Sequence, residues 1–543
     1  MPEPSDPPES ADRSFDGIVF GLLALLAVGL RVNGVGRWWL NPDEGIYYSI
    51  LTRADFAGFW AEVAANAHPP LYYLILRGLG AFTWDFSAFR LFSVLCGTLA
   101  VLAVAGLARE MAGRGRSGTV AAAVAGFIIA VAPGAIELSQ VMRPYMLQLA
   151  LLAGAAWAMA RYDRAPNNRA LAAYAATTSA ALLTHYASGL AVGALGLTAV
   201  GLGYRHRWSD PSWRRLFWIH LVPGAVVVAM YVVHIRPLAG SALADEALDG
   251  WLSFYMISRP ADAWLGFLGF QHLLAGPWLR GPLALLTLGA LLLAHREAPL
   301  VTFLGATALL SAIIGAALGV YPLGSTRHTV WLAFALVPAL GWLAGFVADR
   351  PRNVLVGATA GIVTLCAAGG PVGRIIGAEA APWAPPDQVL LQEDLTRMIG
   401  TLDPESGPEL IIMSAQTFYL LLPFYPEERE GAVFSDDGRH FHFTYGNRRI
   451  LTTTAWDFTA PPEIEGPAHI GRVLGEAGRA FPELRVSEQD PATLLVGGWR
   501  PAFIDELAVQ TERQPFIRSS VFVPGLFAYV IAVDPLLRGF TDG

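Results

Sequence analysis

Long apolar runs dominate the chain up to about residue 375, and most are long enough to cross the roughly 30 Å hydrocarbon core of a membrane. The run PPLYYLILRGLGAF, residues 69–82, is too short to cross, so we interpret it as a helix at the membrane interface. The remaining runs predict a mostly α, polytopic membrane helical bundle of about eleven spans, near residues 15–32, 88–108, 119–135, 142–160, 169–184, 186–203, 216–235, 277–294, 300–320, 328–348 and 353–372.

Arginine residues cluster in alternate connections between these runs, and the positive-inside rule assigns those connections to the cytoplasm. One local signal disagrees, because Arg31 and Arg37 follow the first span whereas only Arg13 precedes it; the total over the whole chain decides our assignment. Residues 33–87 and 236–276 then form long outer loops, which we expect to carry short amphipathic helices. The cytoplasmic clusters are Arg109, Arg114 and Arg116; Arg161, Arg164 and Arg169; Arg205, Arg207, Arg214 and Arg215; Arg296; and Arg350 with Arg352.

The two ends of the chain differ from this pattern. Residues 1–14 are polar and Pro-rich without a basic region or cleavage site, which predicts a disordered cytoplasmic N-terminus and no cleavable signal peptide. Residues 15–375 are expected to form the transmembrane domain. Residues 376–543, which include the linker APWAPPDQ, predict a soluble extracytoplasmic α/β domain, with strands in 408–415, 448–456, 492–499 and 526–534 and helices in 394–402 and 470–481.

Composition agrees with a membrane protein, because only 15% of residues are charged, against about 25% in soluble domains. The formal net charge of −7 argues against a nucleic-acid partner. All 37 basic residues are Arg, which keeps its proton and can bind phosphate through two parallel hydrogen bonds. Cys96 and Cys366 both lie in apolar runs, which favours packing roles over a disulfide and indicates neither a metal nor a redox compartment.

The topology brings many polar side chains to the non-cytoplasmic side of the membrane. A transporter would place such groups near the bilayer midplane in broken helices, whereas a reaction centre opening outward would gather them at one surface. The gathered residues are Asp43, Glu44, His68, Glu137, Arg143, His185, Asp245, Glu246, Tyr321, Arg327 and His328.

The stretch LNPDEGIYYS has a structural explanation beside a catalytic one. Asn41 suits a helix N-cap, Pro42 the first helical position, and Glu44 the third, where it completes a capping box. Adjacent helical residues diverge by about 100°, so one acid can cap while Asp43 faces outward.

The other groups also have ordinary alternatives. His68 precedes a helix that starts at a double proline, so it is either incidental or a donor to an anionic headgroup. Arg143, at the mouth of a span, is either a snorkelling anchor or an anion ligand. His185 lies in a short turn between spans, and Arg327 and His328 begin another span.

Together the segments PDEGIYY, HPPLYYLILR, FRLFSVLCGTLAVLAVAGLAR, SQVMRPYMLQLALL, LTHYASGLAV and YPLGSTRHTVWLAFALVPAL resemble the integral-membrane glycosyltransferases of the GT-C type. More specifically, the chain resembles the family of protein O-mannosyltransferases and bacterial aminoarabinose transferases that modify lipid A. The likeness runs over roughly residues 15 to 350. Each motif is weak alone, but the set in this order is specific.

The resemblance implies transfer of a sugar, with inversion, from a polyprenyl-phosphate donor to a hydroxyl of a glycan, lipid or protein acceptor. It makes Asp43 the general base, with Glu44 beside it in the catalytic loop. It makes Arg143 and Arg327 the donor-phosphate ligands, with His68 and His328. Further site candidates are His185, Tyr145, Tyr321 and Glu137. The resemblance implies a prokaryotic plasma membrane, with the site and the C-terminal domain facing the periplasm or exterior.

Two departures from the family pattern limit this assignment. In the lipid A transferases a Lys follows a metal-binding Glu just ahead of the two prolines, and here those positions are His68 and Ala67. The family's metal ligand is therefore absent, so metal dependence is left open; a divalent cation remains a candidate, and no cofactor is certain from the sequence. The usual Glu between the Gln and Arg of the SQVMR segment is replaced by Val141 and Met142, and Glu137 is a candidate substitute.

Two other functions remain open from the sequence. One is a transporter or flippase for a lipid-linked sugar. The other is a non-catalytic envelope assembly protein whose C-terminal domain does the work, since the resemblance does not cover that domain. It could bind acceptor, contact a partner or stabilise the fold.

Overall fold

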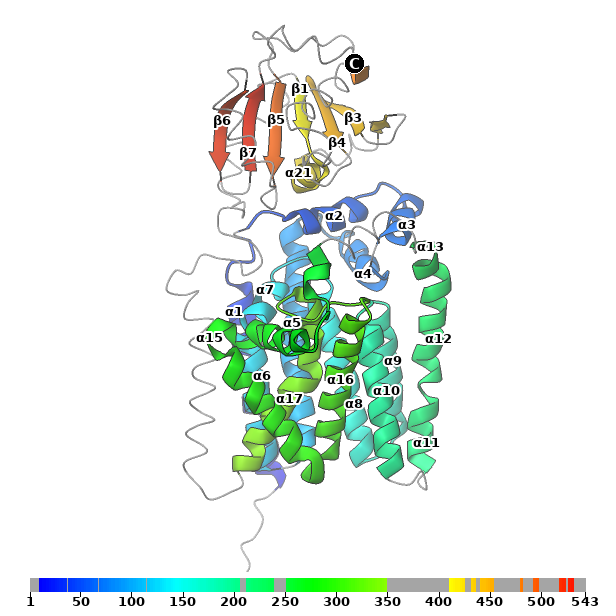
Figure 1. Ribbon diagram of the computed structural model, residues 1–543, viewed down its shortest axis with the longest axis vertical. Coiled ribbons are helices and arrows are strands. Elements are labelled where there is room, and N and C mark those ends of the chain that lie inside the picture. The colour runs from blue at the N-terminus through cyan, green and yellow to red at the C-terminus, as the bar shows by residue number, and fades with distance from the viewer. Residues whose placement is uncertain are drawn as a thin grey trace, which may run out of the picture. The chain divides into compact units, whose positions relative to one another are not determined.

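The structure is a computed structural model that describes residues 9–36, 38–66, 68–113, 115–205, 211–238, 251–348, 410–424, 431–435, 440–453, 479–481, 492–497, 517–523 and 526–531. The chain divides into two compact units, residues 1–35 with 61–378 and residues 36–60 with 379–543. The first unit is a bundle of helices, and the second combines a mixed sheet with short helices (Figure 1).

Every predicted span falls on a helix, except 353–372, which lies outside the described residues. In the described part, five helices are long and apolar enough to cross a membrane, or six if the bent pair α6 and α7 forms one span, so a count of eleven is not confirmed. The bundle helices are α1 (Glu9–Val32), α4 (Leu71–Leu79), α5 (Phe86–Ala112), α6 (Arg116–Val131), α7 (Pro133–Ser139), α8 (Tyr145–Arg164), α9 (Asn168–Leu182), α10 (Ser188–Arg205), α11 (Pro211–Trp218), α12 (Leu221–Met230), η1 (Tyr231–Ile235), α13 (Arg236–Leu238), η2 (Trp251–Tyr255), α15 (Pro260–Glu297), α16 (Pro299–Ala317), η3 (Arg327–Leu332) and α17 (Ala333–Ala348).

The core of the bundle lies around α5 and α17. Helix α5 packs against α1, α6, α8 and α17, and Cys96 is buried within it as a free thiol. The candidate span formed by η3 and α17 is largely internal, because 89% of its most apolar 18-residue stretch is buried. In the candidate span formed by α11, α12 and η1, only 17% of the corresponding stretch is buried. The apolar surface that α12 leaves exposed is typical of a helix facing lipid.

The N-terminal helix differs from expectation at both ends. It begins at Glu9, so part of the segment 1–14 that we expected to be disordered is helical. At the other end, Arg31 is fully buried and is not a loop charge. Arg31 therefore no longer counts as a loop charge against the predicted topology. Arg37, the other charge that opposed it, lies outside the described residues.

Arg31 stabilises a break between two helices. Helices α6 and α7 meet at an angle of 64° at Pro133. The Arg31 guanidinium donates hydrogen bonds to the carbonyls of Ile129 (2.9 Å) and Ala130 (3.0 Å) and to Ser139 Oγ (3.0 Å). The last carbonyls of a helix have no partner within it, so this side chain satisfies the end of α6 and ties it to α7.

Helix α15 contains a second break. Gly276 has a φ of 71° and is followed by Pro277, so the element is two helices joined at a kink. The predicted span 277–294 begins at this kink. The residues before it form a partly buried helix in what we expected to be the outer loop 236–276.

In the second unit a seven-stranded sheet has the order β2-β3-β4-β1-β5-β7-β6. The central strand β1 pairs in parallel with β4 and β5, and the outer pairs are antiparallel. Helix α21 contacts this sheet and also packs against α2, which lies in the predicted outer loop 33–87. The elements are α2 (Pro42–Leu51), α21 (Ala415–Leu421), η6 (Leu422–Phe424), β1 (Leu410–Met413), β2 (Val433–Phe434), β3 (His440–Tyr445), β4 (Arg448–Thr453), β5 (Ala492–Gly497), β6 (Ile517–Val523) and β7 (Leu526–Ile531); α3 (Phe56–Ala65) spans the division between the units.

The four predicted strands are confirmed as β1, β4, β5 and β7, whereas β2, β3 and β6 were missed. The predicted helix 394–402 and almost all of 470–481 lie outside the described residues.

Candidate functional site

Polar and aromatic side chains from the ends of several helices form one cluster in the helical unit. His68 precedes α4, Arg143 and Tyr145 stand at the start of α8, and His185 lies in the turn between α9 and α10. Tyr321 lies in the segment before η3, and η3 begins with Arg327 and His328. We refer to these seven residues as the Arg-His-Tyr cluster. The structure thus brings together candidates that the sequence scattered over 260 positions, counting from His68 to His328.

Tyr321 bridges two histidines at the centre of the cluster. Its hydroxyl lies 3.2 Å from His185 Nδ1 and 3.2 Å from His328 Nδ1. The backbone N–H of Ala187 also donates to His185 Nδ1 at 3.2 Å, so this nitrogen carries no proton and the Tyr321 hydroxyl donates to it. A single phenol therefore sets the orientation of two imidazole rings.

The ring of Tyr145 contacts two of the histidines and Arg143. Its ring centroid lies 5.2 Å from that of His185 and 5.7 Å from that of His328. The Arg143 guanidinium carbon lies 5.8 Å from the Tyr145 ring centroid, within the range of a cation–π contact. His68 completes the group, since its ring lies edge to face with His185 at 5.3 Å.

Backbone hydrogen bonds hold the segments that carry these side chains. The N–H of Leu71, at the start of α4, donates to the carbonyl of Leu183 at 2.9 Å and so ties the segment after His68 to the turn that holds His185. The Thr329 hydroxyl donates to the carbonyls of Gly324 (2.7 Å) and Thr326 (2.9 Å) and fixes the bend that starts η3. The cluster is therefore positioned by the turns themselves.

Gln140 and Arg31 position the segment before Arg143. The Gln140 amide donates to the carbonyls of Arg31 (3.0 Å) and Asn33 (2.6 Å). Together with the Arg31 hydrogen bonds at the break between α6 and α7, this anchors the chain between α7 and α8 on the end of α1. Sequence reasoning missed both roles, because an Arg directly after an apolar run is more often a loop charge.

The imidazole groups of the cluster are kept neutral. Burial, together with the charges of Arg143 and Arg327, lowers the pKa of His185 to about 3. The pKa of His68 is also lowered, first by burial and then by Arg143. Burial raises the pKa of Tyr321. At neutral pH the charges in the cluster are therefore the two guanidinium groups, beside neutral rings and phenol hydroxyls that can donate hydrogen bonds.

This combination is suited to an anion with several oxygens. Guanidinium groups bind phosphate through paired hydrogen bonds, and these bonds are strongest where water is excluded. Arg143 is 7% exposed and His185 is 2% exposed, so the centre of the cluster is shielded from water.

Asp43 and Glu44 belong to the other unit, on helix α2. The predicted helix start is confirmed: Asn41 Oδ1 accepts from the N–H of Glu44 (2.9 Å), and Glu44 Oε2 accepts from the N–H of Asn41 (3.1 Å). Glu44 is 1% exposed and Asp43 is 8% exposed, so both acids are buried and the expectation that Asp43 faces outward is wrong. Helix α2 packs tightly on α21, because a Cβ on Gly45 would lie 2.2 Å from the Tyr419 carbonyl oxygen. Glu44 thus has a structural role.

Glu137 is buried on α7, the short helix that leads toward Arg143. Asp245, Glu246 and Cys366 lie outside the described residues. Among the residues that the structure describes, no group of three or more His, Cys, Asp or Glu side chains could hold a metal ion.

Comparison with known proteins agrees with the motifs. The family model of the dolichyl-phosphate-mannose-protein mannosyltransferases matches residues 67–235. No curated protein matches the chain significantly. Among solved structures, ArnT from Cupriavidus metallidurans bound to undecaprenyl phosphate has a TM-score of 0.50 at 17% identity, covering 96% of this chain and 98% of its own. The same enzyme in the apo state has a TM-score of 0.51 at 15% identity, covering 94% and 97%.

A further match, the S. cerevisiae Pmt1-Pmt2 protein O-mannosyltransferase complex bound to the sugar donor, has a TM-score of 0.33 at 17% identity. It covers 41% of this chain, which spans only 34% of the length of that one. The resemblance to the mannosyltransferases is confirmed by the family match over residues 67–235, and the likeness to ArnT shows that the fold is similar to the GT-C fold.

Proposed function

We propose that this integral membrane protein is an inverting GT-C glycosyltransferase that transfers a sugar from a polyprenyl-phosphate donor to a hydroxyl group of a glycan, lipid or protein acceptor. The observation that carries the proposal is the shielded Arg-His-Tyr cluster, with two guanidinium groups among neutral donors, in a chain with the fold of ArnT. We assign the reaction to the outer face of a prokaryotic plasma membrane, because the cytoplasmic side is assigned to the Arg-rich loops.

The donor phosphate would bind to Arg143 and Arg327. As the bond between the anomeric carbon and the phosphate oxygen breaks, its electron pair stays on that oxygen and the lipid phosphate gains negative charge. Fixed cationic and hydrogen-bond donors lower the energy of such a developing charge most effectively where they are already oriented and dry. The imidazole groups of His68, His185 and His328 and the phenol of Tyr145 can supply the remaining donors. The hydroxyl proton of Tyr321 is used in its hydrogen bond to His185, so Tyr321 orients the imidazole instead.

Asp43 is the proposed general base, which removes the proton from the acceptor hydroxyl as its oxygen bonds to the anomeric carbon. Attack from the face opposite the phosphate inverts the configuration at that carbon. The support for this role is the resemblance of PDEGIYY to the family's first outer loop, together with the capping box. Glu44 is held by the backbone at the start of α2, which leaves its neighbour Asp43 as the acid with a chemical task.

A transporter is less well supported. The cluster residues come from turns and helix ends rather than from breaks in the middle of spans. A carrier that moves a charged lipid across the bilayer would need polar groups near the midplane.

The proposal is tested with the purified full-length protein, a panel of polyprenyl-phosphate sugars and candidate acceptors, followed by lipid mass spectrometry. We expect one donor to be consumed and polyprenyl phosphate to be released. Asp43→Asn should slow turnover by about 10²–10⁴-fold, the usual contribution of a positioned base, while donor binding is retained. Unchanged turnover in this variant would remove Asp43 from the mechanism.

A further inference from the structure

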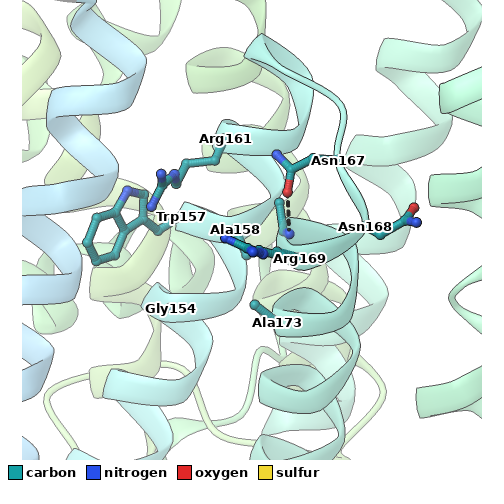
Figure 2. Close-up of a pocket in the computed structure, with 9 residues that line it drawn as sticks. Gly154, Trp157, Ala158, Arg161, Asn167, Asn168, Arg169 and Ala173 are labelled. Carbon is teal, nitrogen blue, oxygen red and sulfur yellow. Dashed lines mark hydrogen bonds between the residues drawn. The ribbon is translucent and has the colours of Figure 1, made fainter.

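A groove lies between α8 and α9 at the end of α8 remote from Arg143. It has a volume of about 870 Å³, and Figure 2 shows the side chains that line it. Trp157 and Arg161 come from the last turns of α8, and Asn167, Asn168 and Arg169 come from the start of α9. Since α8 has 20 residues, its two ends are separated by about 30 Å, the thickness of a hydrocarbon core.

Positive charge gathers at the mouth of this groove. The Arg161 side chain is 62% exposed, and the carboxylate of Glu110 lies 3.8 Å from it. Glu110 is held more closely by Arg164, at 3.0 Å, so it does not neutralise the groove by itself. Arg169 is exposed and makes no ion pair with any residue that the structure describes.

The start of α9 adds backbone donors to the two guanidinium groups. Asn167 caps the helix, and its side-chain oxygen accepts from the N–H of Ala170 at 2.9 Å. The N–H groups of Asn168 and Arg169 precede the first residue that can find an acceptor within the helix, and the positive end of the helix dipole lies beside them. An anion in the groove would meet donors from two elements.

The inner wall of the groove is apolar. It consists of the Trp157 indole together with Gly154, Ala158, Ala170 and Ala173. The indole packs directly against α5, because a Cβ on Gly106 would lie 2.7 Å from it. Gly154 leaves room beside α9, where a Cβ would first meet Thr177 at 3.8 Å. An apolar wall that leads away from a cationic mouth matches a molecule with an anionic head and a hydrocarbon tail.

We propose that this groove binds an anionic membrane phospholipid, with the headgroup phosphate between Arg161 and Arg169 and an acyl chain along Trp157 and the alanines. Basic pockets between membrane helices are a recurrent site for such lipids. The lipid is distinct from the sugar donor, and its binding does not depend on the proposed reaction. Its leaflet is the one that contacts the Arg-rich loops.

The test is native mass spectrometry of the purified full-length protein titrated with phosphatidylglycerol or phosphatidylcholine. We expect phosphatidylglycerol to bind preferentially. The double variant Arg161→Gln, Arg169→Gln should weaken that binding by roughly thirtyfold, since each Arg near an anionic surface contributes about fivefold, and leave phosphatidylcholine unaffected. Arg205→Gln, at the exposed end of α10, is the matched control and should change nothing.

A second variant tests whether binding needs the open space of the groove as well as its positive charge. Ala173→Trp fills the groove but keeps both guanidinium groups, so it should reduce phosphatidylglycerol binding as well. The proposal is overturned by unchanged binding in the double variant, by an equal loss in Arg205→Gln, or by full binding in Ala173→Trp. Displacement of phosphatidylglycerol by equimolar inorganic phosphate would assign the groove to a free anion and overturn the lipid assignment.

Discussion

The two ends of α8 carry the same kind of charge in opposite surroundings. At its start, Arg143 is 7% exposed and lies beside Tyr145 and the histidines. Near its end, the Arg161 side chain is 62% exposed and lies 3.8 Å from Glu110. A charge interaction is several times stronger in a shielded site than near water, and surface interactions are screened by salt. The comparison teaches that one helix can offer a strong, specific anion site at one end and a weak, salt-sensitive one at the other.

The largest expected effect is on donor binding at the shielded end. Arg327→Ala or Arg143→Ala should weaken binding of a polyprenyl-phosphate sugar by about a hundredfold, because removing one partner of a buried charge pair typically costs 2–5 kcal/mol. Titration of the purified protein with donor, followed by native mass spectrometry, measures the change.

The matched control for this effect is Arg161→Ala, near the other end of α8, the helix that Arg143 precedes. It should leave donor affinity within twofold of the original, in line with an exposed surface charge. If Arg161→Ala weakened donor binding as much as Arg143→Ala, the donor phosphate would not be specific to the Arg-His-Tyr cluster.

Acid should act on the stability of the fold rather than on donor binding. The pKa of His185 in the folded protein is about 3, below its ordinary value of 6.5, so the folded state resists protonation. The stability that depends on neutral His185 is complete above pH 6.5 and is lost as the pH falls from 6.5 toward 3, at up to about 1.4 kcal/mol per pH unit. Thermal unfolding of wild type and His185→Gln between pH 7 and pH 4 measures it.

In that experiment the variant should lose stability less steeply than the wild type. His295→Gln, an exposed position in the last turn of α15, provides the control and should follow the wild type. If the unfolding temperatures of wild type and His185→Gln fell in parallel with pH, His185 would not be held neutral in the cluster.

A still smaller effect is expected from one hydroxyl group. Tyr321→Phe keeps the ring but removes the oxygen that lies 3.2 Å from both His185 Nδ1 and His328 Nδ1. Donor affinity or turnover should fall by about fivefold, in line with a net hydrogen-bond contribution of roughly 1 kcal/mol. Tyr204→Phe, at an exposed site on α10, should have no effect. Equal donor affinity and turnover for Tyr321→Phe and wild type would show that the hydroxyl bridge between His185 and His328 does not contribute to either.

The smallest expected effect is the difference in the salt dependence of ligand binding between the two ends of α8. Raising ionic strength from about 0.1 M to 1 M shortens the screening length from about 10 Å to 3 Å. Phosphatidylglycerol binding at the groove should fall severalfold, while donor binding at the shielded cluster should change less than twofold. The reverse order of salt sensitivity would contradict the contrast between the ends of α8.

Sequence alone predicted the helices of the bundle and named all seven members of the cluster as candidates, since apolar runs mark spans and polar residues at their ends stand out. It could not predict that Tyr321 bridges His185 and His328, because this depends on three turns meeting in space. Arg31 shows the same limit. Its position after an apolar run indicates a loop charge, yet the break at Pro133 supplies carbonyl acceptors that draw it inside.

One missed strand of the sheet, β3, could have been predicted from the sequence. Strands β3 and β4 are joined by the two residues Gly446 and Asn447, and Gly446 has a φ of 55°. A two-residue Gly-containing turn between alternating strands predicts a hairpin, so β3 could have been found from the alternation in HFHFTY. Strand β6 pairs with β7 through a register shift at Ser519 and Val521, which no local pattern indicates.

The most direct test of the central claim is a cryo-EM structure of the full-length protein with polyprenyl phosphate added. We predict phosphate density within hydrogen-bond distance of Arg143 and Arg327, beside Tyr321, and its loss in Arg327→Ala. Phosphate density away from both guanidinium groups, or density that persists unchanged in Arg327→Ala, would contradict the assignment of the Arg-His-Tyr cluster as the donor site.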